Sequence, residues 1–297
     1  MVAEDTNKAK ISVVIPTLNA SGEIDRLLFL LENQTLKPLE ILVVDSSSDD
    51  DTVDIAKFHD LAQVKVIKRS DFNHGLTRHW AFQETVGDYV LFMTQDAVPA
   101  DGELLERIVA PMEKDPQICQ VTGRQLPKPE ARPFERLVRE FNYPEQSNIR
   151  SMKDVDQLGI KAYFSSDVCC CYRRSAYLEV GGFGETDMSE DMLMSITLLR
   201  AGYKIAYAAD ARVFHSHNYT PRQQFNRNRA VGRFLEQHKK SLNGVNEMGE
   251  GISLVRKVSE SLLLKGHVIE LVGFGVDCLA RVIGNRVGRA EIRNNSQ

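Results

Sequence analysis

The sequence has little that would point to a membrane-spanning, disulfide-bonded or nucleic-acid-binding protein. Its 297 residues include five cysteines, three of them in the run Cys169–Cys171, and this spacing fits neither a zinc site nor a disulfide framework. We therefore expect core thiols in a reducing compartment. Residues 1–10 are polar, residues 11–16 are too short for a signal core, and the apolar stretch 268–283 is too short and too charged to span a bilayer. The net charge of −4 argues against a general nucleic-acid binder.

Two common nucleotide-binding motifs are also missing. Residues Pro16–Gly22, which follow the first expected strand, lack the glycine-rich turn of a dinucleotide-binding dehydrogenase. The Gly-Lys-Ser/Thr motif of a P-loop kinase is absent from the chain. A composition of 42% hydrophobic and 26% charged residues instead predicts one large or two small globular domains.

What the sequence does contain is a first half in which strands and helices alternate. Strands are expected at 11–15, 41–44, 64–67 and 89–93, and helices at 21–31, 52–58, 76–84 and 103–110, the last ending at Pro111. This alternation predicts a parallel sheet with helices on both faces. The second half is mixed, with strands at 119–122, 168–172 and 204–207, a short apolar pair after a turn at 213–214, and helices at 132–141 and 220–240.

Single carboxylates stand where two of these strands end. Asp45 follows the second strand, and Asp96 follows the apolar run 89–93. Ligand groups of an open α/β sheet lie at such strand ends, and Asp oxygens suit Mg²⁺ or Mn²⁺ on a phosphate. A plain turn residue is the competing interpretation of Asp96.

A second acidic pair opens a helix. Ser189 precedes Glu190 and Asp191, and the apolar positions 192, 193, 196 and 199 follow at helical spacing. Ser189 as N-cap and two carboxylates near the positive end of the helix dipole would account for the pattern by capping alone. The alternative is a general base, which the site at Asp96 would need.

Several motifs then occur in an order that resembles one family. They are Pro16-Thr17-Leu18-Asn19, Asp45 with its Ser/Asp loop, His74-Gly75 with Arg78, Thr94-Gln95-Asp96, Gly181-Gly182-Phe183, Glu190-Asp191 and His215-Ser216-His217. The chain resembles the family 2 glycosyltransferases of the GT-A fold over residues 10–240. The sequences Phe72-Asn73-His74-Gly75 and Thr94-Gln95-Asp96-Ala97 are most similar to those of bacterial rhamnosyltransferases of surface-polysaccharide assembly.

The resemblance implies a fold and a division of the chain. The fold would be α/β of GT-A type, a mostly parallel nucleotide-binding sheet flanked by helices, with a mixed acceptor-side half and a helical C-terminal tail. Residues 10–100 would form the nucleotide-sugar half, 101–240 the acceptor half, and 241–297 a helical extension.

The resemblance also implies a donor site. Asp45 would accept a hydrogen bond from the nucleotide base, with Thr17 and Asn19 beside it. Arg78 would face the diphosphate, because guanidinium pairs well with phosphate. The remaining nucleotide-binding residues would be His74, Gly75 and Gln95.

The metal, Mg²⁺ or Mn²⁺, would bind Asp96 and His217, with His215 as the second choice for the histidine. Histidines at i and i+2 of an extended segment point the same way. The family commonly has two acids two residues apart in its metal motif. Thr94 stands in the first of these positions here, so strict metal dependence is open.

For the chemistry, the resemblance implies an inverting enzyme. Asp191 would take the proton from an acceptor hydroxyl that attacks the anomeric carbon, while Glu190 would orient the acceptor or cap the helix. Asp167 would line the acceptor cleft, unless it is a turn residue.

The partners follow from this activity. We expect a nucleoside-diphosphate sugar as donor, dTDP-rhamnose or a UDP-sugar, a glycan or lipid-linked acceptor, and no nucleic acid. A sugar nucleotidyltransferase and a non-catalytic nucleotide-sugar-binding scaffold remain the alternatives.

The C-terminal tail carries two apolar stretches and a basic cluster. The basic residues are Arg281, Arg286, Arg289 and Arg293. An interfacial helix on the cytoplasmic face of the inner membrane, a partner-facing helix of a homo-oligomer, or a helix packed on its own core would each fit this pattern. The protein itself is expected to be cytoplasmic.

Overall fold

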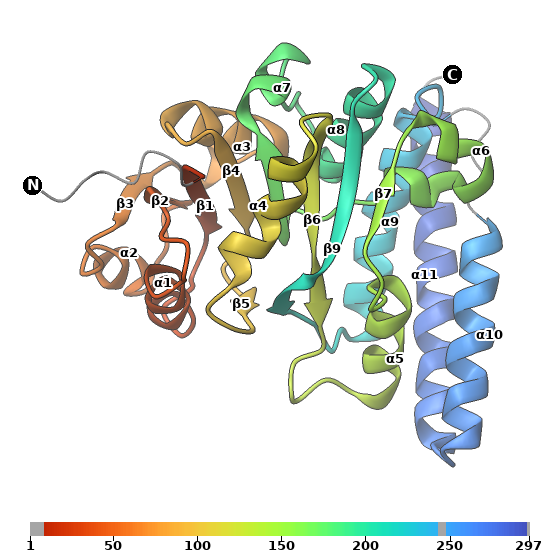
Figure 1. Cartoon of the computed structure of the whole chain (residues 1–297). Helices are drawn as coiled ribbons and strands as arrows, with labels where there is room; N and C mark the ends of the chain where they lie inside the picture. The colour runs from red at the N-terminus through yellow and green to blue at the C-terminus, as the bar shows by residue number, and fades with distance from the viewer. Residues whose placement is uncertain (1–8, 243–247, 296–297) are drawn as a thin grey trace, which may run out of the picture. The chain divides into compact units, whose positions relative to one another are not determined.

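The computed structural model describes residues 9–242 and 248–295 (Figure 1). The strands are β1 (Ile11–Thr17), β2 (Glu40–Asp45), β3 (Ala62–Val66), β4 (Tyr89–Met93), β5 (Val98–Pro99), β6 (Ile118–Leu126), β7 (Asn148–Arg150), β8 (Cys169–Arg173) and β9 (Lys204–Phe214). The helices are α1 (Ile24–Glu32), α2 (Thr52–Ala56), α3 (His74–Glu84), α4 (Leu104–Lys114), α5 (Pro133–Asn142), α6 (Val155–Leu158), α7 (Arg174–Glu179), α8 (Glu190–Arg200), α9 (Pro221–Gln237), α10 (Met248–Leu264) and α11 (Val268–Asn295). Three short 3₁₀ turns lie at Arg69–Asp71, Met152–Asp154 and Gly159–Tyr163.

The chain folds into two compact units. The first contains the residues up to Gln125, Glu145–Met152 and Phe164–His215. The second contains Leu126–Pro144, Lys153–Tyr163 and the chain from Ser216 onward. The domain boundaries expected from the sequence stay a prediction.

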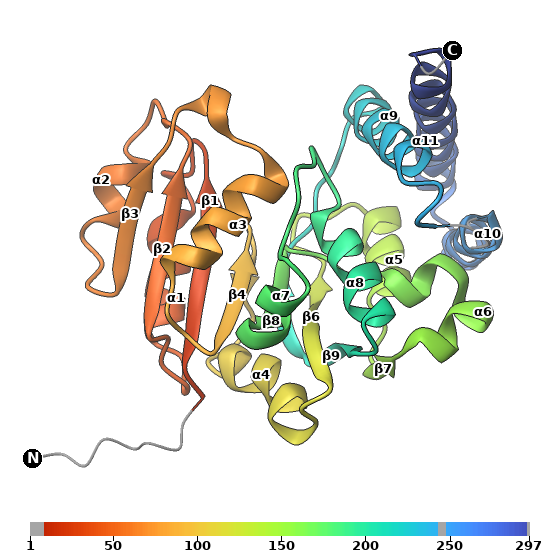
Figure 2. The same ribbon diagram turned by 90° about the horizontal axis from the view of Figure 1, so that it is seen from above.

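The first unit is built on one sheet, with the strand order β3-β2-β1-β4-β8-β6-β9-β5 and β7 paired to β9 (Figure 2). Strands β1, β2, β3 and β4 are mutually parallel, whereas β8 runs antiparallel to β4 and β6. The predicted parallel first half and mixed second half of the sheet are thereby confirmed.

Alternation along the strands gives the sheet two apolar faces. Ile11, Val13 and Ile15 of β1 pack with buried residues of α1 and α4 on one face. The other face carries an aromatic cluster, in which Phe82 of α3 stacks on Tyr177 of α7 with ring centroids 3.8 Å apart. Helices therefore cover both faces, as the alternation of elements predicts.

The strand ends are what position the site. Parallel pairing sets Thr17 beside Asp45 at the carboxyl ends of β1 and β2. Because β8 is antiparallel to β4, Cys169 pairs with Met93, so β8 begins at the edge where β4 ends. The segments that carry Asp96 and Asp167 thus reach the same edge of the sheet.

Two details of the expected elements were wrong. Helix α4 does not end at Pro111 but runs to Lys114, because a proline so near the end of a helix costs one intrahelical hydrogen bond and the last turn still closes. The expected turn before residues 213–214 is absent. Strand β9 continues through Asp210, whose exposed side chain breaks the apolar pattern without breaking the strand.

The second unit is mostly helical. Its apolar core joins Phe134 and Val138 of α5 to Val258 and Leu262 of α10 and Phe274 of α11. The helical C-terminal tail is confirmed, with α10 and α11 running side by side as a hairpin (Figure 1).

Candidate active site

An arginine of α3 lies among the predicted acceptor-side carboxylates. Arg78 is 5% exposed, and its Nη1 atom is 3.1 Å from Oε1 of Glu190. Its Nε atom is 3.6 Å from Oδ2 of Asp167. Although predicted to face the diphosphate, Arg78 is thus held by side chains from the start of α8 and the segment before β8. Its predicted phosphate contact stays a prediction.

The predicted base is tied to the same cluster through the backbone. Oδ2 of Asp191 accepts a hydrogen bond from the N–H of Asp167 at 3.0 Å, and Oδ1 accepts one from the N–H of Met192 at 2.6 Å. The carboxyl of Asp167 in turn accepts from the hydroxyl of Tyr172 at 2.7 Å. Asp167, Glu190 and Asp191 are therefore assembled around Arg78, and their acceptor-side and catalytic roles stay predictions.

Burial and crowding change the acidity of these groups. Burial raises the pKa of Asp191 to about 7, and the neighbouring charge of Glu190 adds to this, while two backbone N–H groups and Arg78 oppose it. Burial also raises the pKa of Asp167 well above its ordinary value, followed by the charges of Glu190 and Asp191. Burial lowers the pKa of Arg78, but Glu190 and Asp167 outweigh this effect and raise it. An Asp191 carboxyl that titrates near neutrality can accept a proton and release it again.

The start of α8 is held in place by the start of α3. Oδ1 of Asn73 caps α3 through the N–H groups of Gly75 and Leu76, and it also accepts from the N–H of Thr186 at 3.2 Å. A Cβ atom on Gly75 would collide with the carbonyl oxygen of Gly184. The sequence predicts a nucleotide contact for Gly75, but what the structure reveals is a close approach between this helix and the loop that leads to Asp191.

Capping by Ser189, the competing interpretation of this segment, takes an unexpected form. Ser189 occupies the N-cap position of α8 with a left-handed φ of 59°, and its side chain makes no capping hydrogen bond. A left-handed non-glycine residue is strained, and such residues tend to cluster at functional sites. The carboxyl of Asp191 itself accepts a hydrogen bond from the N–H of Met192 in the first turn of α8. Asp191 therefore stabilises the start of the helix as well as belonging to the group of carboxylates around Arg78.

The predicted nucleotide residues at the ends of β1 and β2 form a hydrogen-bonded loop pair. The buried Asp45 carboxyl accepts from the hydroxyl of Thr17 at 3.1 Å and from the N–H of Ser48 at 2.8 Å. Asn19, with a φ of 52°, accepts from the N–H of Asp49 at 2.9 Å. The structure therefore brings Thr17, Asn19 and Asp45 together through the loop after β2.

Gln95 joins this group from the end of β4. Its side-chain amide accepts from the N–H of Leu18 at 2.8 Å and donates to the Leu18 carbonyl at 3.2 Å. Because both backbone groups of Leu18 are satisfied, the loop after β1 is fixed to the loop after β4. His74 lies apart from these residues at the start of α3, where its Nδ1 atom is 3.9 Å from Oε1 of Glu190.

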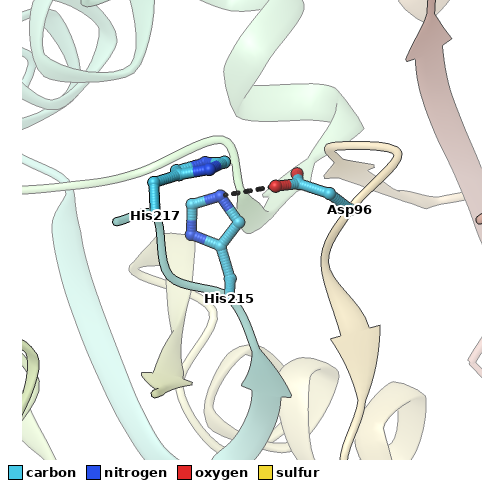
Figure 3. Close-up of side chains that lie close together, drawn as sticks. All are labelled: Asp96, His215 and His217. Carbon is cyan, nitrogen blue, oxygen red and sulfur yellow. Dashed lines mark ion pairs between the residues drawn. The ribbon is translucent and has the colours of Figure 1, made fainter. Parts of the chain in front are cut away.

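Asp96 has a histidine as its neighbour. Nε2 of His215 is 3.4 Å from Oδ2 of Asp96, and both belong to the first unit (Figure 3). His217 is two positions further along the chain, and one ligand atom from each of the three residues lies within 4.8 Å of the others. The second-choice ligand, His215, is thus the one in direct contact with Asp96.

These three residues suit a divalent cation. Nδ1 of His215 is 2.9 Å from Oε1 of Gln125, whose amide nitrogen donates to the hydroxyl of Ser166 at 3.0 Å. If the ring is neutral and donates from Nδ1 to Gln125, Nε2 is the nitrogen that would bind a cation beside the Asp96 carboxylate. Two acceptors in this arrangement favour a cation between them, and an oriented second nitrogen is typical of metal-bound histidine.

Sequence reasoning missed two members of the site. Tyr172 holds the Asp167 carboxyl, and Gln125 orients His215. Neither stands in a motif. The sequence feature that could have found them was their position on β8 and β6, two central strands of the sheet.

The fold and site point to the class of enzymes that transfer sugars from nucleotide donors, and comparison with known proteins establishes it. Residues 12–181 match the profile of glycosyl transferase family 2. The chain belongs to this family and is a glycosyltransferase, as its motifs predict.

Within this family, the chain is similar to two O-antigen chain rhamnosyltransferases. The chain is 43% identical over 222 residues to the O-antigen chain rhamnosyltransferase RfbN of Salmonella typhimurium, covering 73% of this chain and 70% of that one. It is 37% identical over 284 residues to the O-antigen chain rhamnosyltransferase WbaN of Salmonella anatum, covering 94% and 89%. The predicted similarity to bacterial rhamnosyltransferases is confirmed, and neither alternative class is favoured.

Solved structures agree on the fold. The mannosyltransferase PcManGT from Pyrobaculum calidifontis, in complex with GDP-Man and Mn²⁺, matches with a TM-score of 0.65 at 15% identity, over 98% of this chain and 89% of that one. TarS of S. aureus, residues 1–349 with UDP, matches with a TM-score of 0.57 at 17% identity, over 96% and 92%. At these identities the likeness is one of fold, and it supports the GT-A assignment.

Among the helices of the described residues, none combines the length and apolar character needed to cross a membrane.

Proposed function

We propose that this enzyme transfers L-rhamnose from dTDP-rhamnose to a glycan or lipid-linked acceptor during surface-polysaccharide synthesis. The alternative donor is a UDP-sugar. The observation that carries the proposal is the 37% identity to an O-antigen chain rhamnosyltransferase over 94% of the chain. The donor sugar and the acceptor are inferences from this relative and its 43% identical counterpart.

For the donor, we assign the loops held by Thr17, Asn19, Asp45 and Gln95 to the nucleotide. Asp45 already accepts from Thr17 and Ser48. A ring N–H of the base would have to take the place of the Ser48 hydroxyl, which lies 2.5 Å from Oδ1 of Asp45. Pyrimidine bases offer such a donor at N3 when they are thymine or uracil, which fits a dTDP- or UDP-sugar.

For the metal, we propose that Asp96 and His215, with His217, hold Mg²⁺ or Mn²⁺. A bound divalent cation would neutralise the charge that develops on the departing diphosphate. The 3.4 Å approach of His215 Nε2 to Asp96 Oδ2 supports this assignment, and the contact of Nδ1 with Gln125 keeps the ring turned toward the carboxylate.

For the chemical step, we propose that Asp191 is the general base. Its raised pKa lets the carboxylate remove the proton of an acceptor hydroxyl near neutral pH, and the Asp167 N–H keeps it oriented. The hydroxyl oxygen then forms a bond to the anomeric carbon as the bond to the diphosphate breaks on the opposite face, with inversion. Arg78 holds Glu190 and Asp167 in place beside this base.

Product analysis with a panel of sugar nucleotides tests the proposal. Incubation with dTDP-rhamnose and an acceptor glycan should release dTDP and add one rhamnose. Calorimetry should show binding of dTDP or UDP. Release of pyrophosphate would point to a nucleotidyltransferase, binding without turnover would point to a scaffold, and tighter binding of ADP and GDP than of dTDP and UDP would rule out the donor class.

A further inference from the structure

Helix α11 is amphipathic, but its apolar side faces outward. From Val268 to Ile283, every exposed large side chain of the helix is apolar. Beyond Ile283, the polar side chains of Arg286, Arg293 and Asn294 are also exposed. The exposed apolar side chains are Val268, Ile269, Val272, Val276, Leu279, Val282, Ile283 and Val287. Steps of three and four residues place them on one face, here called the α11 stripe. A surface helix ordinarily turns such a face toward its core.

Asp277, Arg281 and Glu291 of α11 lie away from this face and are paired. Oε1 of Glu291 is 2.6 Å from Nε of Arg229, and Asp277 is paired within the helix to Arg281 at 2.6 Å. The two helices approach so closely that a Cβ atom on Gly284 or Gly288 would collide with the α9 backbone. These contacts fix the rotation of α11, so the outward position of the stripe is a property of the packing.

The turn between α10 and α11 extends the apolar surface. Leu264 is 89% exposed and Ile269 is 88% exposed, and they flank Lys265 and the left-handed Gly266. Figure 1 shows this turn at the far end of the α10–α11 hairpin. The hairpin tip, defined as residues 263–269, thus adds Leu263 and Leu264, which are 58% and 89% exposed, to the α11 stripe.

We propose that the α11 stripe and the hairpin tip dock onto an anionic lipid surface, with α11 lying in the interface. The stripe spans about 29 Å at 1.5 Å per residue, enough for a long contact parallel to a membrane. Lys265 is exposed at the hairpin tip and Arg286 within the stripe, and both match anionic headgroups. The acidic Asp277 and Glu291 are turned toward Arg281 and α9, and Glu270, at the start of α11, is half-buried. This surface goes beyond the proposed function and does not depend on the identity of the donor.

The competing occupant is a second copy of the chain. Residues 269, 272, 276, 279 and 283 have the alternating spacing of a coiled-coil seam. Arg286 would be the next seam position, where a charge weakens a helix pair, and Val268, Val282 and Val287 make the stripe wider than a two-residue seam. A broad apolar face with cations beside it fits a lipid interface better.

Vesicle flotation tests the proposal with the full chain and no substrate. Vesicles of phosphatidylglycerol and phosphatidylcholine in equal parts should carry the wild type upward, and vesicles of phosphatidylcholine alone should carry much less. Leu264→Asn with Ile269→Asn should lower vesicle binding at least tenfold, because the variant loses the free energy gained when these two apolar side chains leave water for the lipid. Lys265→Glu should lower it about fivefold or more.

The matched controls are exposed apolar residues of the first unit. Phe58→Asn and Val86→Asn replace side chains that are 88% and 70% exposed, and both should leave binding unchanged. Unchanged melting temperatures would show that every variant is folded. Because no sugar is transferred in this assay, its failure would leave the proposed activity standing.

Two results would overturn the lipid proposal. One is equal recovery of wild type and tip variant in the vesicle-free fraction. The other is a wild-type dimer in sedimentation velocity that the double substitution Val272→Asn with Leu279→Asn converts to monomers, together with no binding of the wild type to vesicles. That second result would assign the α11 stripe to a second copy of the chain.

Discussion

The backbone N–H of Asp167 donates to Oδ2 of Asp191 at 3.0 Å, and this bond ties the start of β8 to the start of α8. The two carboxyls are therefore not independent, because any shift of the segment before β8 moves the donor that orients the proposed base. Arg78 contacts Asp167 and Glu190 but has no direct ion pair with Asp191 among the described contacts. The cluster thus positions the base through the backbone and leaves its charge only partly compensated.

The pH dependence of transfer follows from the raised pKa of Asp191. The base must be ionised, so the rate of a single turnover should rise as pH increases through about 7 and then level off. Because the charge of Glu190 raises the pKa of Asp191, Glu190→Gln should move this rise to lower pH. A pH profile of single-turnover transfer for both proteins checks the sign. A rise centred near pH 4 in the wild type would contradict the buried base.

Removal of the Arg78 guanidinium should destabilise the fold. Arg78→Met leaves the buried carboxyls of Asp167 and Glu190 without their cation, and breaking a buried pair in this way costs about 3–5 kcal/mol. Thermal or denaturant unfolding measures the loss. Arg26→Met on the exposed face of α1 is the matched control and should cost less than about 0.5 kcal/mol. Equal stability of the two variants would show that the cluster does not need its arginine.

Close packing at the start of α3 gives a sharper test of how the loop before α8 is held. Gly75→Ala would push a methyl group against the carbonyl oxygen of Gly184 and displace the loop, so both stability and transfer should fall. Gly184→Ala, whose Cβ would meet no atom within 4 Å, should be close to wild type. Transfer rates and melting temperatures of the pair separate a collision from a general effect of added bulk.

The proposed metal site predicts a loss that added cation does not repair. Asp96→Ala and His215→Ala each remove one of the two facing groups, so transfer should fall strongly in both, and EDTA should abolish wild-type transfer until Mg²⁺ or Mn²⁺ is restored. Calorimetric titration with Mn²⁺ in the presence of the nucleotide provides a readout without turnover. Full activity of the EDTA-treated wild type would leave the diphosphate to be stabilised by protein cations alone.

Much of this fold could be predicted because local patterns agree with it. The apolar run 89–93 ends at the predicted residue and lies at the centre of the sheet, and the strand–helix alternation gives the parallel half. The expectations at Pro111 and Asp210 were wrong for the same reason. Each is locally unfavourable, and packing of α4 and pairing of β9 outweigh that local preference.

The site could be predicted only as far as its motifs extend. The acidic residues 96, 167, 190 and 191 and the histidine beside Asp96 were found from the sequence, whereas Tyr172, which holds Asp167, was not. Arg78 was expected at the diphosphate, and its contact with Glu190 depends on a separation of 112 positions that no local pattern encodes. The outward apolar face of α11 was likewise visible only as a stretch, since its direction is set by the contact of Gly284 and Gly288 with α9.

The proposed mechanism depends most on Asp191 as the general base, and single-turnover transfer by Asp191→Asn tests this role most directly. Asn keeps the size of the side chain and one of its two backbone hydrogen bonds, but it cannot accept a proton at neutral pH. Transfer should therefore fall by about 10²-fold or more, while donor affinity and the folded state are retained and Glu190→Gln harms the chemical step less. A near-wild-type rate in Asp191→Asn would contradict the account and leave Asp191 as a residue that only begins a helix.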